Sequence, residues 1–106
     1  MPKPLFKNLH TSTGFVATGT GAWVDVTGYD IPLGIAVGGV FVGTIVIEVS
    51  NDGGTTAIQF GSNVTAVGTV KVDIPVQFVR ARCSAYTSGT ILVALGATNS
   101  SSYDQV

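Results

Sequence analysis

Charge is what this sequence has least of. Asp, Glu, Lys and Arg make up 10% of its 106 residues, and the formal net charge is -1; about a quarter of a typical soluble protein is charged. Binding to nucleic acid or to an anionic membrane surface depends on clustered Lys and Arg, so we expect neither partner. So few charges also indicate a surface that is partly covered by a partner or by other copies of the chain.

Residues for catalysis and metal binding are also scarce. The single cysteine, Cys83, excludes an internal disulfide framework, and its alanine-flanked position indicates a small buried thiol. The single histidine, His10, lies near the N-terminus and is not clearly placed to activate a nucleophile. One histidine and one distant cysteine make a poor metal site. We therefore predict a protein that is not an enzyme, with no catalytic residues, no metal and no cofactor. The six acidic residues show no evident pairing: Asp25, Asp30, Glu48, Asp52, Asp73 and Asp104.

Signals for secretion and for helices are missing as well. The opening Met-Pro-Lys-Pro contains no apolar run, so synthesis in the host cytoplasm is expected. Residues 31–47 are uncharged and contain GxxxG spacings, as membrane helix pairs do. The stretch is short, lacks basic flanks and is rich in β-branched residues, so two strands separated by a bend at 38–39 are predicted instead. No segment shows a capped helical period.

The stretch Gly43–Gly54 shows what the chain has in abundance, which is short apolar strands followed by glycine. Ile45, Ile47 and Val49 alternate with more polar residues, as in a strand with one buried face. The sequence Asn-Asp-Gly-Gly at 51–54 tolerates positive φ and predicts a tight reversal, after which 55–60 returns as the second arm of a hairpin.

Similar strands recur along the chain at spacings of about 8 to 12 residues. They are expected near 15–29, 33–37, 40–50, 55–60, 67–74, 76–86 and 90–95. Seven or eight strands predict an all-β fold, a single-domain antiparallel β-sandwich of the jelly-roll type. The sandwich is assigned to residues 15–97. Residues 1–14 are interpreted as an extended N-terminal arm that lies along a neighbour, with a partly ordered terminus as the alternative, and 98–106 as a loosely held polar C-terminal tail.

The most informative polar residues are Arg80 and Arg82. They lie two apart on the strand 76–86, so both project from one face, together with Phe78 and Tyr86. One interpretation is a solvated face on which the arginines pair with Glu48 or Asp73. The other is a protein interface in which the guanidinium groups bind carboxylates or carbonyls of a partner. With two apolar anchors in the arm, the predicted interface residues are Leu5, Phe6, Phe78, Arg80, Arg82 and Tyr86.

Trp23 is expected on the face opposite Val24 and Val26. Packing at the core or its rim is one interpretation. The other is a sugar-stacking platform shared with Tyr29 and Tyr86.

Together these stretches resemble small β-sandwich virion proteins of tailed bacteriophages. The resemblance covers residues 21 to 96 and is carried by Gly21-Ala22-Trp23, Gly43 to Glu48, Ser50 to Gly54, Phe78-Val79-Arg80-Ala81-Arg82 and Ser88-Gly89-Thr90. It implies a capsid decoration (cement) protein on the outside of the virion head, which binds across coat subunits as a homotrimer. The implied partners are the phage coat protein lattice and other copies of the chain. A tail or fibre component and a carbohydrate-binding module are the alternatives.

Overall fold

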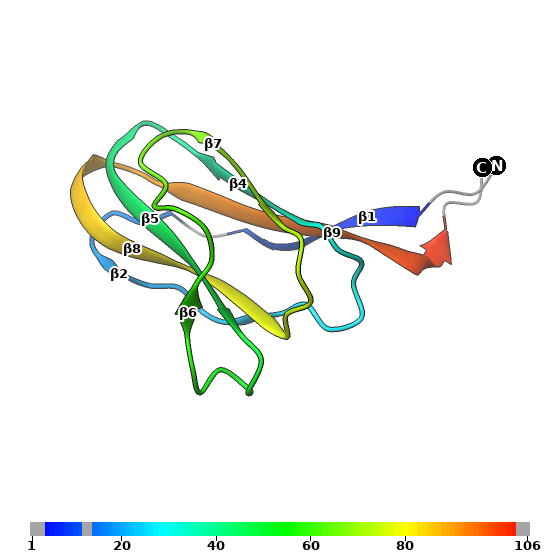
Figure 1. Ribbon diagram of the computed structural model, residues 1–106. Coiled ribbons are helices and arrows are strands. Elements are labelled where there is room, and N and C mark those ends of the chain that lie inside the picture. The colour runs from blue at the N-terminus through cyan, green and yellow to red at the C-terminus, as the bar shows by residue number, and fades with distance from the viewer. Residues whose placement is uncertain (1–3, 12–13, 104–106) are drawn as a thin grey trace.

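The protein is a sandwich of two antiparallel β-sheets (Figure 1). The computed structural model describes residues 4–11 and 14–103. These residues contain strands and no helix, which confirms the predicted all-β fold. The strands are β1 (Pro4–Thr11), β2 (Gly19–Thr20), β3 (Val24–Asp25), β4 (Leu33–Gly38), β5 (Phe41–Ser50), β6 (Ile58–Gln59), β7 (Gly68–Val72), β8 (Phe78–Gly89) and β9 (Leu92–Tyr103).

The strand order is that of a jelly roll. One sheet has the order β1-β9-β4-β7, and the other has the order β2-β8-β5-β6, with β3 also paired to β8. β2 and β3 lie beside the same strand, so they act as one broken strand. Counted this way, eight strands form two four-stranded layers, as in a double Greek key. The prediction of a jelly-roll sandwich is confirmed.

The core lies between the two sheets and follows the alternation in the sequence. On β4, Leu33, Ile35 and Val37 are buried, while Gly34 and Ala36 between them face outward. The same alternation places Ile45, Ile47 and Val49 of β5 inside, as predicted. The other buried apolar residues of the core are Val26, Val72, Val79, Cys83, Ile91, Val93, Leu95 and Ala97.

The two ends of the chain belong to one sheet. β1 pairs with β9 from Pro4 opposite Tyr103 to Thr11 opposite Ala94, and the pair extends beyond the sandwich as a ribbon (Figure 1). The boundaries predicted at residues 14 and 98 therefore do not follow the sheet. The described part of the arm lies along its own chain, because it pairs with β9 as an antiparallel strand with two register shifts. The ends of the arm and of the tail, 1–3, 12–13 and 104–106, lie outside the described residues.

The turn after β5 is longer than predicted. Gly53 and Gly54 have positive φ, at 75° and 89°, as the sequence indicated. The reversal, however, spans residues 51–57, and the returning strand is only Ile58–Gln59. The Asp52 carboxylate stabilises this wider loop, because its Oδ1 accepts hydrogen bonds from the Ser50 hydroxyl and the Thr56 N–H, both at 2.8 Å.

Residues 31–47 contain β4 and most of β5, which agrees with the two-strand prediction. Within the described part of the chain, there is no helix with the length and apolar character needed to cross a membrane.

Candidate functional site

The outer face of the five-stranded sheet carries a cluster of charged and aromatic side chains. We call it the Glu48 cluster, and its members are Trp23, Glu48, Phe78, Arg80 and Arg82. Glu48 of β5 lies directly opposite Arg80 of β8 in the sheet. Arg80 donates from Nε to Oε1 of Glu48 at 2.8 Å, and Arg82 donates from Nε to Oε2 at 3.2 Å. One carboxylate therefore orients both arginines.

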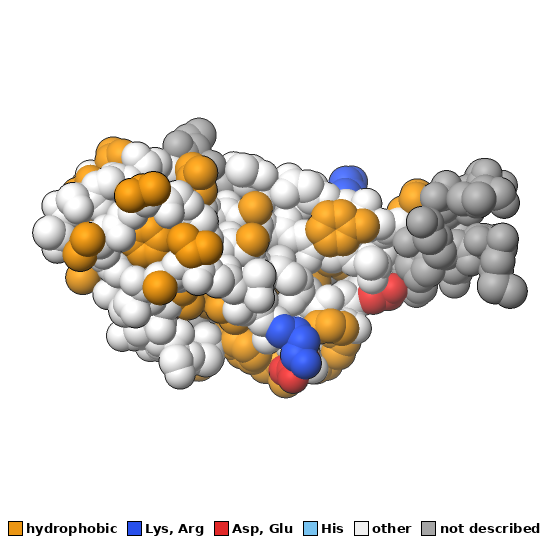
Figure 2. Space-filling view, turned by 90° about the horizontal axis from the view of Figure 1, so that it is seen from above, with side chains coloured by type: hydrophobic (Ala, Val, Ile, Leu, Met, Phe, Trp, Pro, Cys, Tyr) orange, Lys and Arg blue, Asp and Glu red, His pale blue; other side chains and the backbone are white. Residues whose placement is uncertain are grey.

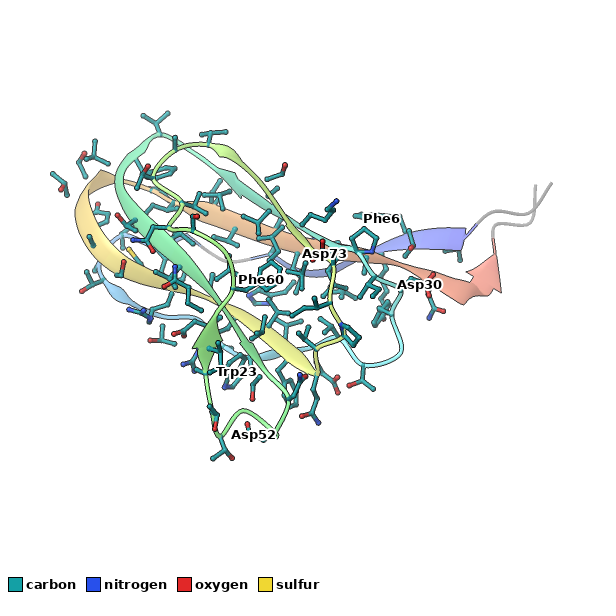
Figure 3. The ribbon with its side chains drawn as sticks, in the orientation of Figure 1. Phe6, Trp23, Asp30, Asp52, Phe60 and Asp73 are labelled. Carbon is teal, nitrogen blue, oxygen red and sulfur yellow. The ribbon has the colours of Figure 1, made fainter. Side chains whose placement is uncertain are left out.

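Trp23 extends the cluster toward the loop after β5 (Figure 3). The Arg80 guanidinium carbon lies 4.2 Å from the centroid of a Trp23 ring, in cation–π geometry. The Phe78 ring lies 6.3 Å from the Trp23 ring at an interplanar angle of 48°. The indole also lies so close to the loop that a Cβ on Gly54 would be 2.8 Å from its Nε1. The loop glycine thus leaves room for the indole.

Glu48 remains ionised although only 8% of it is exposed. Burial favours the protonated form, but the hydrogen bonds and positive charges of Arg80 and Arg82 outweigh this effect. The pKa of Glu48 is therefore lowered from its ordinary value of 4.5. Two guanidinium groups against one carboxylate leave a local charge of about +1.

The cluster can donate hydrogen bonds to a partner. Both contacts to Glu48 use Nε, so the terminal Nη groups of Arg80 and Arg82 have no partner among the described residues. The side chain of Arg82 is 37% exposed and that of Arg80 is 22% exposed. A carboxylate or a backbone carbonyl of another protein matches these donors. Of the two interpretations, the structure shows the internal ion pair, with Glu48 and not Asp73 as its acidic partner. The interface interpretation stays a prediction.

The structure separates the six predicted interface residues. Phe78, Arg80 and Arg82 lie together in the cluster. Tyr86 does not, because the register between β5 and β8 shifts between Thr44 and Ile45 and skips Ser84. The extra residue turns the Tyr86 ring toward the core, where its hydroxyl donates to the Gly89 carbonyl at 2.7 Å. The prediction that Tyr86 shares the arginine face was wrong.

Leu5 and Phe6 lie on β1, in the other sheet, and are 42% and 70% exposed. The Phe6 ring covers Gly96 of β9, where any side chain would collide with it. Phe6 therefore faces outward on the opposite side of the sandwich from the Glu48 cluster (Figure 3). The two predicted anchors and the arginines do not form one surface.

The aromatic residues of the carbohydrate alternative are also dispersed. Trp23 packs in the Glu48 cluster and Tyr86 packs on the core. Tyr29 lines a groove of about 560 Å³ at the end of the sandwich, between the segment after β3 and Pro75–Gln77. No two of the three form a common platform. Cys83 is buried, as predicted, and its Sγ lies 3.3 Å from the Ala85 carbonyl.

Sequence reasoning missed that Trp23 belongs with the arginines. The contact depends on the pairing of Val24 with Val79, which no local pattern reveals. Within the ranges 4–11 and 14–103, no group of three or more His, Cys, Asp and Glu side chains is placed to hold a metal ion.

Comparison with known proteins gives one informative result. No protein-family model matches the sequence, and no curated protein sequence matches it. A solved structure, the crystal structure of SPBc2 prophage-derived protein YomS, has a TM-score of 0.70 over 93% of this chain and 96% of that chain. The two proteins share a fold. At 13% identity the similarity shows the sandwich and no more.

Proposed function

We propose that the protein is a structural virion protein of a tailed bacteriophage, and that it acts as a capsid decoration (cement) protein. The observation that supports the proposal is the shared fold with a prophage-derived protein over nearly the whole of both chains. The role needs no catalytic residue, cofactor or metal. It needs a rigid unit with surfaces that bind neighbouring coat subunits on the outside of the head.

The Glu48 cluster is suited to such binding. Glu48 and Trp23 hold Arg80 in place before any partner arrives, so less side-chain freedom is lost on binding. Arg82 offers planar donors that match carboxylates and backbone carbonyls of a coat subunit. Arginine and tryptophan are also the residues that most often dominate interface energies. Many symmetric copies multiply a modest contact into a large stabilisation of the head.

The proposal includes self-association, as the homotrimer implied by the resemblance. A tail or fibre position is the other arrangement of a virion protein, and it is separated from the head position by experiment. No arrangement of residues favours a carbohydrate platform, because the three aromatic residues lie apart.

The test is to look for the chain in virions of the phage that encodes it. Mass spectrometry of gradient-purified virions should detect the chain, and immunogold labelling should decorate heads. Heads from a gene-deletion phage should lose DNA at lower temperature than wild-type heads, and added purified protein should restore them. Absence of the chain from virions would overturn the proposal, and labelling of tails alone would overturn the decoration role.

A matched pair of variants tests the Glu48 cluster. Arg82→Ala should lower the occupancy of the protein on deletion-phage heads by about tenfold, as loss of a central interface arginine does. Lys71→Ala removes an exposed cation from the four-stranded sheet and should leave occupancy unchanged. Equal occupancy of both variants would show that the arginines are only internal partners of Glu48.

A further inference from the structure

One end of the sandwich exposes a group of large apolar side chains. We call it the valine tip, and its members are Val16, Val40, Val42, Val67 and Leu92. Their exposed fractions are 63%, 90%, 58%, 67% and 43%, respectively. The hydrophobic side chains at the left end of Figure 2 show this crowding on the visible face.

Backbone pairing brings the four segments of the tip together. The Thr90 N–H donates to the Val40 carbonyl at 3.1 Å, and Val42 lies opposite Ser88. Leu92 lies opposite Gly38 in the other sheet. Val16 follows Phe15, which pairs with Ile91. Val67 precedes Gly68, which pairs with Val37, so both valines lie at the same end of the sandwich.

The valine tip carries no charged side chain. Residues 14–20, 37–44, 64–69 and 84–92 contain no Asp, Glu, Lys, Arg or His. Figure 2 shows the charged side chains of the visible face away from this end. The aspartates labelled in Figure 3 also lie away from it. Charge and exposed valine thus occupy different parts of the molecule.

This separation restricts what can cover the tip. A charged protein surface would lose its hydration there without gaining a counter-charge, which is unfavourable. An anionic lipid surface is attracted by Lys and Arg, and interfacial anchors use Trp and Tyr exposed to the headgroups. The segments of the tip contain no Lys, Arg or Trp, and the one tyrosine in them, Tyr86, packs against the core and donates its hydroxyl to the Gly89 carbonyl. The surface of this protein that matches the tip is the same tip of another copy, which is equally apolar and uncharged.

The sheet edges are less suited to self-association. β1 is the long free edge of the four-stranded sheet, and it carries Lys7 and a register shift between Asn8 and His10. β7, at the other edge, is five residues long and carries Lys71. Edge lysines, bulges and short edge strands all oppose the addition of a foreign strand.

The area available at the tip sets the expected strength. The molecule measures 47 × 31 × 20 Å, and the tip closes one end of the long axis. An end-on contact therefore buries at most roughly 600 Å² per copy, the product of the two shorter dimensions, which is near the lower limit for specific interfaces. Association should be reversible, with dissociation constants on the order of micromolar or weaker.

We infer that copies of this chain associate with one another through the valine tip. The inference assigns a surface to the self-association included in the proposed function. It is argued from the exposure and neutrality of the tip, so it can be tested apart from the virion role. An assembly that gathers many copies would raise their local concentration and complete the contact.

The test is light scattering after size exclusion, over a range of concentrations. The average mass measured for the wild-type chain should rise from the monomer value of 10.8 kDa toward two or three times that value as concentration increases. Val42→Asp should keep the monomer mass throughout. The matched control is Ile58→Asp, because Ile58 is also 58% exposed but lies opposite Val49, seven residues from Val42 along β5. That separation is about 23 Å.

Circular dichroism should show the same β-type spectrum for both variants, so that a fold defect is not mistaken for lost association. If Val42→Asp weakens the β-type circular dichroism signal, Val40→Asp is used in its place, since Val40 is 90% exposed. A wild-type chain that stays monomeric up to millimolar concentration would overturn the inference. So would an oligomer that both aspartate variants leave intact, or that Ile58→Asp alone breaks.

Discussion

Two positions on strand β5 reverse the usual rule of burial. Glu48 is charged and 8% exposed, whereas Val42 is apolar and 58% exposed, and both face outward from the same sheet. Glu48 is buried because two arginines on β8 satisfy its oxygens. Val42 is exposed because nothing in a single copy covers the end of the sandwich. Burial here follows from the partners available and not from the polarity of the side chain.

The largest effect should come from removing the centre of the Glu48 cluster. Glu48→Ala leaves Arg80 and Arg82 half-buried without a counter-charge, so we expect unfolding free energy to fall by about 3 kcal/mol. Chemical denaturation of the dilute protein measures it. Asp73→Ala, at an exposed acid, is the control and should change stability by less than about 0.5 kcal/mol. Equal effects of the two variants would mean that Glu48 holds nothing in place.

The next effect separates the loop backbone from the Trp23 contact. Gly53 and Gly54 both have positive φ, but only at Gly54 would a Cβ meet Trp23. Gly53→Ala should cost about 1 kcal/mol for the backbone alone. Gly54→Ala should cost about 2 kcal/mol, because the indole must also move. Tryptophan fluorescence should change only in Gly54→Ala, and identical spectra and stabilities in both variants would rule out a tight contact.

Acid should reduce the stabilisation that the Glu48 cluster provides, whereas the valine tip has no carboxylate that acid could protonate. The pKa of Glu48 is lower in the folded chain than its ordinary value of 4.5, so its contribution is present above pH 4.5 and is lost as pH falls through the folded pKa. The pKa of Asp52 is lowered to about 2 by Thr56 and Ser50, so its contribution is lost below about pH 4. Stability should therefore decline from pH 5 to 2. In Glu48→Gln the decline should be shallower, and an unchanged slope would contradict this account.

The smallest effect should come from the valine tip itself. Val42→Thr should change the stability of the dilute monomer by less than about 0.5 kcal/mol, since most of this side chain is already in water. The same measurement at high concentration should show a larger difference, because association stabilises only the folded wild type. A cost above 2 kcal/mol in dilute solution would place Val42 in the core instead.

The sequence predicted those parts of the fold that follow from local alternation. Ile45 and Ile47 were placed inside correctly, and the glycine-bounded strands were sufficient to predict a jelly-roll sandwich. Tyr86 was misplaced because the extra residue at Ser84 reverses the side chains of Ala85 and Tyr86, before a second register shift at Thr87 restores the alternation. The meeting of Trp23 with Arg80 depends on pairing between distant strands, which period-two patterns do not encode.

The polar end of the chain was misjudged for a similar reason. Residues 98–106 are polar, with Asn and several Ser, so composition indicated a loose tail. In the structure residues 98–103 continue β9, because the backbone of β1 lies alongside and pairs with them regardless of their side chains. The lesson applies to any chain whose first and last segments can meet.

The pairing of β1 with β9 also determines how the protein responds to force. Pro4 lies opposite Tyr103, so both ends of the described chain lie at one tip of the ribbon. Tension applied between them would unzip the hydrogen bonds one at a time instead of shearing them together. We therefore expect low resistance to force applied between Pro4 and Tyr103.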